Sequence, residues 1–180
     1  LYLAGRVELT EQERLGLELF ESETKGNCAA CHPTEAGPDG SPPLFTDFSY
    51  DNLGSPKNPA NPFYLLPPEL NPDGADYIDL GLGAVVDDPA QNGKFRVPTL
   101  RNVALTPPYM HNGVFATLDE VVDFYVTRES ARPDAGAAER ILRPLDLDAQ
   151  ARADLVAFLE SLTDDSLDLS LVRAPQDSTR

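Results

Sequence analysis

Apolar residues recur at helical spacing in three parts of the chain, and a capping residue precedes each part. In the first part, Thr10 and Glu13 have the spacing of a capping box, and the apolar positions after them continue to Phe20. This pattern predicts a helix over residues 11–22. A second capping box, Thr117 to Glu120, predicts another helix. Its apolar stripe has i, i+3, i+4, i+7 spacing and consists of Leu118, Val121, Val122 and Tyr125.

A third helix is predicted to begin near Asp148 and to end at the polar residues that follow Leu162. Its apolar positions are Leu155, Phe158, Leu159 and Leu162. Residues 33–98 differ from these helices because they hold 12 of the 17 prolines and have little periodicity. So long a stretch without regular structure is expected to wrap a large apolar object. The fold class is therefore mostly α with long wrapping loops, in one domain over residues 1–165, followed by a polar tail over residues 166–180.

The charge of the chain limits what it binds. Thirty acidic residues against 14 basic ones give a net charge of −16. Such a surface repels phosphate backbones and anionic lipids, so nucleic acid and membrane surfaces are poor partners. The charge would attract a basic partner or keep the protein soluble in high salt, and both interpretations stay open. No apolar run approaches the length of a membrane-spanning helix.

The only two cysteines, Cys28 and Cys31, are followed directly by His32. A Cys-x-x-Cys-His run is the attachment signature of c-type haem, in which each thiol adds to one vinyl group and the histidine binds the iron. A redox dithiol would need a preceding strand and a βαβ setting, and a zinc site would need ligands beyond His111, the one other histidine. We therefore expect one covalently bound haem and a periplasmic or other extracytoplasmic location, since this attachment takes place outside the cytosol.

The second axial position of the iron has three candidates: Met110, His111 and Tyr125. A thioether raises the iron potential, a phenolate lowers it, and an open position admits peroxide or oxygen. Ligand chemistry alone favours Met110, because a thioether is the usual partner of histidine in electron-transfer haems. Arg96 and Arg101 are candidate partners of the haem propionates, although both would serve equally well as surface residues.

Three motifs resemble a known family: Phe95 to Thr106, Pro108 to Gly113 and Ala116 to Leu118. They are similar to the C-terminal, electron-transfer haem domain of bacterial dihaem cytochrome c peroxidases and of the related methylamine dehydrogenase maturation enzyme. The segments Leu1–Phe20 and Asp154–Leu159 fit the same domain, so the resemblance covers nearly the whole chain. It implies a cytochrome c-like haem domain.

The resemblance also implies site residues. Cys28, Cys31 and His32 match the family's haem attachment motif. The distal ligand of the family's electron-transfer haem lies fourteen residues after the histidine of the Pro-Tyr-x-His motif, which here is Tyr125. The resemblance therefore favours Tyr125, whereas ligand chemistry favours Met110. Family members also bind calcium between two domains, partly through backbone carbonyls that match Thr106 and Pro108, with the other ligands in the preceding domain.

One haem motif and no evident catalytic acid or base favour an electron-transfer cytochrome that is not itself an enzyme. It would be a periplasmic monohaem protein with a six-coordinate haem, and its acidic surface would guide a basic redox partner. The alternative is a haem subunit or fragment of a dihaem peroxidase or maturation-type oxidoreductase, with the second haem in another domain or subunit. A third reading is a structural haem subunit of a larger redox assembly.

Overall fold

The computed structural model describes residues 8–128, 145–168 and 170. Its helices are α1 (Glu11–Glu21), α2 (Leu82–Val86), α3 (Leu118–Thr127) and α4 (Ala149–Ser161), and its strands are β1 (Tyr50–Asp51) and β2 (Phe95–Arg96). Five 3₁₀ turns complete the regular structure of these residues. The predicted mostly α architecture is confirmed. Among the described residues, no helix has the length and apolar character needed to cross a membrane.

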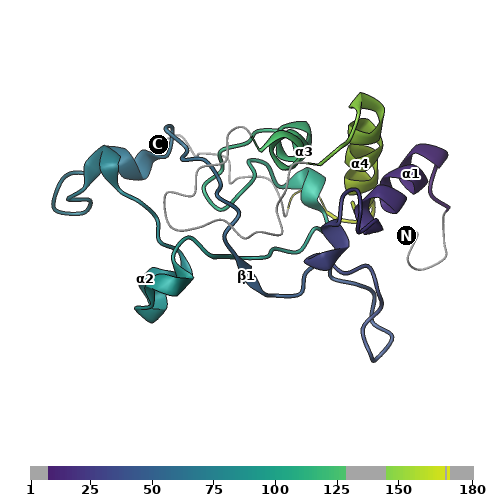
Figure 1. Cartoon of the computed structure of the whole chain (residues 1–180), viewed down its shortest axis with the longest axis horizontal. Coiled ribbons are helices and arrows are strands. Elements are labelled where there is room, and N and C mark those ends of the chain that lie inside the picture. The colour runs from purple at the N-terminus through teal and green to yellow at the C-terminus, as the bar shows by residue number, and fades with distance from the viewer. Residues whose placement is uncertain (1–7, 129–144, 169, 171–180) are drawn as a thin grey trace.

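Helices α1 and α4 pack closely at one end of an elongated molecule, with α3 beside them (Figure 1). Gly16 makes the close approach possible, because a Cβ atom at this position would lie 2.0 Å from the backbone oxygen of Asp154. Beside this contact, the rings of Phe20 and Phe158 lie 5.1 Å apart, edge to face. Phe45 adds a third ring, 6.4 Å from each of them. This aromatic cluster is the centre of the hydrophobic core.

The helix starts agree with the predicted caps. Both capping boxes form, with Thr10 paired to Glu13 at α1 and Thr117 paired to Glu120 at α3. The side chain of Asp148 accepts a hydrogen bond of 2.9 Å from Ala151 N at the start of α4. Helix α1 ends at Glu21, one residue before the predicted end. The sequence pattern therefore placed all three long helices correctly.

The predicted apolar faces are confirmed only in part. On α3, Leu118 and Val122 are buried as expected, whereas Val121 and Tyr125 are half-buried because they line a cavity. The buried side chains that the stripes missed are Phe124 and Val126 on α3 and Asp154 and Val156 on α4. On α4, Leu155, Phe158 and Leu159 are buried and Leu162 is half-buried. The helices are thus enclosed on more sides than an amphipathic surface helix.

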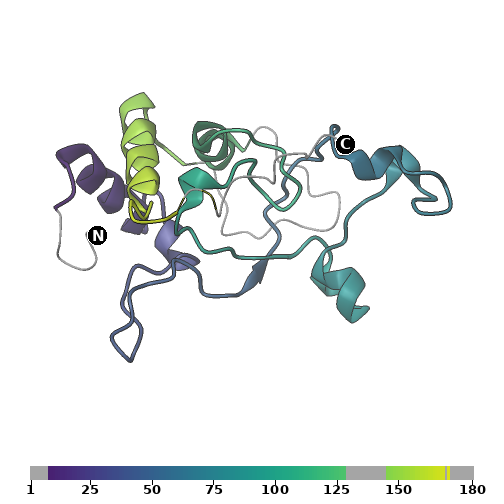
Figure 2. The ribbon, with the colours of Figure 1, turned by 180° about the vertical axis from the view of Figure 1, so that it is seen from behind.

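Residues 33–98 contain more local structure than the sequence predicted. β1 pairs antiparallel with β2, placing Tyr50 opposite Arg96, and the segment between them carries short 3₁₀ turns and α2. The turns at 62–65 and 74–76 project at the end of the molecule away from α1, and α2 projects nearby (Figures 1 and 2). Of the predicted tail, residues 166, 168 and 170 are exposed, whereas 169 and 171–180 lie outside the described residues, so the division at residue 165 stays a prediction.

Candidate functional site

We call the end of the molecule formed by α1, α3 and α4 the helical end. A cavity of about 700 Å³ lies between the helical end and residues 33–98. Its size falls in the range of about 300–1,000 Å³ that is usual for sites of small molecules and cofactors. Its walls are mostly apolar and come from the turn at 28–30, strand β2, the loop that follows it, and helices α3 and α4. The chain thus encloses an apolar space with contributions from almost its whole length, as the proline-rich segment predicted.

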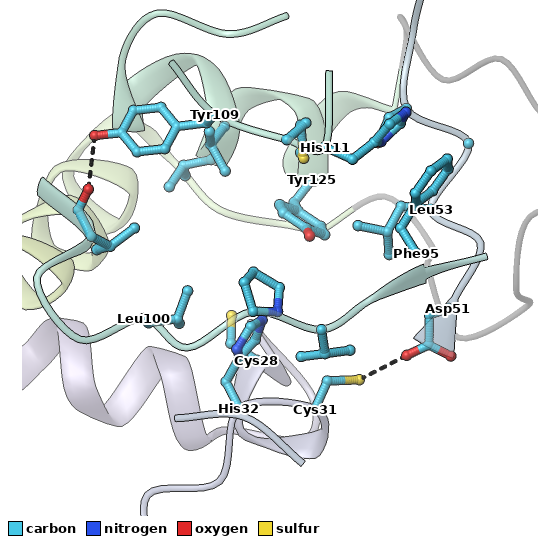
Figure 3. A pocket seen from close by; sticks show the side chains of 18 of the residues that line it. Cys28, Cys31, His32, Asp51, Leu53, Phe95, Leu100, Tyr109, His111 and Tyr125 are labelled. Atoms are coloured by element: carbon cyan, nitrogen blue, oxygen red, sulfur yellow. Dashed lines mark hydrogen bonds between the residues drawn. The ribbon is translucent and has the colours of Figure 1, made fainter. Parts of the chain in front are cut away.

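One wall of the cavity carries Cys28, Cys31 and His32 (Figure 3). The turn is preceded by Asn27 at φ 53°, and His32 N donates to Cys28 O at 2.9 Å. Gly26 is required before it, because an added Cβ atom would lie 2.4 Å from the backbone oxygen of Leu19. This tight turn presents both thiols and the imidazole to the same space.

The two cysteines form no disulfide with each other, and their surroundings favour protonated thiols over thiolates. Burial raises the pKa of Cys28 to about 12 and the pKa of Cys31 to about 11. Cys31 Sγ donates a weak hydrogen bond to Asp51 Oδ2 at 3.7 Å, and the negative charge of Asp51 adds to the rise. A redox dithiol works with a lowered thiol pKa, so these values count against a thioredoxin-like role.

The imidazole of His32 is oriented by the backbone. Its Nδ1 lies 2.8 Å from the carbonyl oxygen of Phe45, and donation by Nδ1 leaves the lone pair of Nε2 free. Burial lowers the pKa of His32, against the opposing effect of the Phe45 carbonyl, so the neutral ring is favoured. Phe45 itself has φ 52°, an uncommon conformation for a side chain of this size. A neutral, oriented imidazole is the form that binds metals.

The three candidates for the second axial position, Met110, His111 and Tyr125, all line the same cavity. Figure 3 shows His111 and Tyr125 on the side opposite Cys28 and His32. The hydroxyl of Tyr125 points across the space towards Cys28 and His32 (Figure 3). Burial raises the pKa of Tyr125 well above its usual range, and the charge of Arg128 opposes this in part. The ring of His111 stacks on Phe95 with centroids 3.5 Å apart and an interplanar angle of 8°.

The structure places the two predicted propionate partners, Arg96 and Arg101, in different surroundings. Arg96 lines the cavity, and its guanidinium lies over the ring of Phe48, 4.8 Å from the centroid. Arg101 is not among the residues that line the cavity, and its Nε donates to Pro43 O at 2.8 Å. The structure thus brings Arg96 to the site and gives Arg101 a partner elsewhere. Their roles towards a haem stay predictions.

Arg128 is a residue that the sequence analysis missed. Its Nη2 donates to Leu53 O at 2.6 Å and its guanidinium lies over the ring of Phe124, 4.5 Å from the centroid. Its Nη1 is buried and has no hydrogen-bond partner among the described residues. Burial lowers the pKa of Arg128. The signal available in the sequence was its place one helical turn after Tyr125.

The predicted calcium ligands lie at the edge of the same cavity. Thr106 and Pro108 both line it and are exposed, on either side of the cis Pro107–Pro108 peptide bond. Across residues 8–128 and the later described positions, no cluster of three or more histidine, cysteine or acidic side chains could hold a metal ion. Calcium binding through the two carbonyls stays a prediction.

Comparison with known proteins gives consistent matches. The family model of cytochrome c matches residues 14–163. The methylamine utilization protein MauG of Paracoccus denitrificans is 38% identical over 182 residues, which cover 90% of this chain and 45% of MauG. The cytochrome-c peroxidase IdrP2 of Denitromonas iodatirespirans is 38% identical over 171 residues, covering 89% of this chain and 42% of that protein.

A solved structure supports the same relationship. The dihaem peroxidase BthA of Burkholderia thailandensis superposes with a TM-score of 0.70 at 35% identity, over 91% of this chain and 45% of that chain. This chain therefore spans less than half the length of each of these three relatives.

Proposed function

The chain belongs to the cytochrome c family and is related to MauG and the dihaem cytochrome c peroxidases, and we propose that it is one haem domain of a dihaem redox protein. In this proposal it holds one covalent haem c and exchanges electrons with a second haem centre in another domain or subunit. The similarity to dihaem proteins favours this alternative over the isolated monohaem carrier that the single haem motif led us to expect. The observation that carries the proposal is the cavity with Cys28, Cys31 and His32 on one wall and Tyr125 on the other.

The residues of the cavity fit a haem. Two thiols and one neutral imidazole face a space whose walls are mostly apolar, and a porphyrin needs both the covalent partners and the apolar surroundings. When bound, the haem supplies an iron that is oxidised and reduced by one electron. The protein supplies attachment, orientation and electrostatics around it.

Each wall has a distinct task in this proposal. Cys28 and Cys31 would form the thioether bonds, and His32, whose ring is oriented by Phe45 O, would bind the iron through Nε2. Tyr125 would supply the second iron ligand, which fits the direction of its hydroxyl in Figure 3. Arg96, at the cavity wall, binds a propionate.

The net charge of −16 supports a basic redox partner, and the predicted covalent attachment of haem supports an extracytoplasmic location. Opposite charges speed the encounter of two proteins and lose their effect as salt screens them. We therefore expect electron transfer with a basic partner to slow as ionic strength rises. A rate that does not depend on ionic strength would count against a charge-guided partner.

The haem count tests the proposal. The protein is isolated from its natural host with any domain or subunit that accompanies it, and haem is measured per polypeptide by a pyridine haemochrome assay together with intact mass. We expect one haem attached to residues 28–31 and a second haem elsewhere in the same protein or complex. A single haem in a protein that works alone would favour the monohaem carrier instead.

The distal ligand needs a separate test. Tyr125→Phe should change the absorption and electron paramagnetic resonance spectra of the oxidised protein, because it removes the phenol oxygen. Tyr109→Phe is a matched control, because Tyr109 lines the same cavity but its hydroxyl donates to Val103 O at 3.2 Å. Equal spectra for Tyr125→Phe and the parent protein would exclude Tyr125 as the ligand.

A further inference from the structure

We propose that Met110 is a second distal ligand, which binds the iron in its reduced state, while Tyr125 binds it in the oxidised state. This inference rests on the proposed function, because it requires a haem held by His32 in the cavity. Met110 and Tyr125 line one cavity, so each can serve as the iron ligand in a different oxidation state.

The first observation that supports this proposal is the position of Met110. Met110 lines the cavity, and its neighbours in the chain, Tyr109 and His111, both lie on the wall that faces His32 (Figure 3). This wall is a short hairpin in which Tyr109 N donates to Phe115 O at 2.7 Å. The only methionine of the chain thus lines the cavity between two residues of the wall that also carries Tyr125.

The second observation is the backbone conformation of the hairpin that contains Met110. Met110 has φ 66°, a region that glycine adopts readily and that costs other residues about 1 kcal/mol or more. Contacts on both sides hold this backbone: Asn112 Nδ2 donates to Pro56 O at 2.8 Å, and Asn58 Nδ2 donates to Asn112 O at 2.9 Å. The stacking of His111 on Phe95 fixes the next residue. The loop thus keeps a thioether at a cavity wall where its backbone geometry favours glycine.

The third argument comes from the chemistry of the two ligands. A phenolate is a hard donor that stabilises ferric iron, and a thioether is a soft donor that stabilises ferrous iron. When an external one-electron reductant reduces the iron, the bond from iron to the Tyr125 oxygen breaks, and that oxygen takes up one proton from solvent. The Met110 sulfur then donates a lone pair to the iron. Oxidation by one electron reverses each change, so atoms and charge balance.

The single methionine permits a direct test on the haem-loaded protein. Methionine labelled with ¹³C at its methyl group is incorporated, and the protein is reduced with dithionite. We expect the methyl resonance that Met110→Leu removes to lie far upfield, because the porphyrin ring current acts on a methyl group bound next to the iron. Met110→Leu should also convert the reduced spectrum from low-spin to five-coordinate high-spin. A methyl resonance at an ordinary position, or an unchanged reduced spectrum, would overturn the proposal.

The oxidised state separates this inference from the proposed function. We expect no sulfur-to-iron absorption band in the oxidised parent protein, and the appearance of this band in Tyr125→Phe but not in Tyr109→Phe. A band already present in the parent protein would refute the exchange and leave the haem site intact. Failure of the protein to bind haem at all would refute the proposed function itself.

Discussion

The helical end and residues 33–98 differ in where they keep their apolar side chains. The buried apolar core is built mostly by α1, α3 and α4, and residues 33–98 contribute only Pro43, Phe45 and Val97 to the buried apolar side chains described. The same segment holds every large exposed apolar side chain described except Leu15. The helical end thus has a core of its own, whereas residues 33–98 have little apolar surface buried within the protein.

This difference indicates what holds each region together. Burial of apolar surface is the main source of stability, so the helical end is stabilised by its own packing. Residues 33–98 instead form much of the cavity wall, and an apolar ligand there would supply contacts that the segment does not make with itself. We therefore expect the folding of residues 33–98 to depend on the haem far more than the folding of α1 and α4.

The largest effect is expected when the haem is lost. The double variant Cys28→Ser, Cys31→Ser cannot attach haem covalently, and its amide hydrogen exchange is compared with that of the haem-loaded protein. We expect residues 33–98 to lose most of their protection, while amides of α1 and α4 keep more of theirs, because those helices retain a packed core. Equal loss in both regions would show that the helical end has no independent stability.

The second prediction compares the loss of stability on truncating one buried and one exposed apolar side chain. Phe158 is 2% exposed in the aromatic cluster, whereas Leu65 is 86% exposed in the projecting segment. Phe158→Ala should lower the free energy of unfolding by about 3–5 kcal/mol, and Leu65→Ala should change it by less than about 0.5 kcal/mol. Urea titrations of the haem-loaded protein, followed by circular dichroism, measure both. A cost at Leu65 as large as that at Phe158 would mean that a partner or contact covers the projecting segment.

A smaller effect is expected at the start of α3. Thr117 Oγ1 accepts a hydrogen bond of 3.2 Å from Glu120 N, so Thr117→Ala should destabilise the protein by about 1 kcal/mol. Thr117→Ser keeps the hydroxyl and is the matched control, with an expected change below about 0.5 kcal/mol. Thermal unfolding of the two variants distinguishes them. Identical losses would indicate that the cap contributes nothing and that packing alone fixes α3.

The sequence predicted what depends on local chemistry. Capping boxes and helical spacing lie within one turn, so Thr10, Thr117 and Asp148 marked the helix starts correctly. The attachment motif at residues 28–32 is equally local, and the structure places its side chains in one cavity. The family assignment followed from motifs of the same kind and is confirmed by the family match together with the similarity to MauG and the dihaem peroxidases.

The rest depends on contacts between distant residues. Phe45 O orients His32 across 13 residues, and Arg128 reaches Leu53 O across 75, so neither pairing leaves a local pattern. The two apolar stripes missed Phe124 and Asp154 because α3 and α4 are enclosed by other parts of the chain. The short strands of residues 33–98 were missed because each is two residues long and gains its partner only in the folded chain.

The most direct test of the central claim is the mass of the peptide that contains residues 27–33, obtained by digestion of the purified, acid-denatured protein. The account predicts that this peptide carries the added mass of one haem on its two cysteines, retained after denaturation because the bonds are thioethers. A peptide with the mass of its amino acids alone, from a colourless protein, would contradict it.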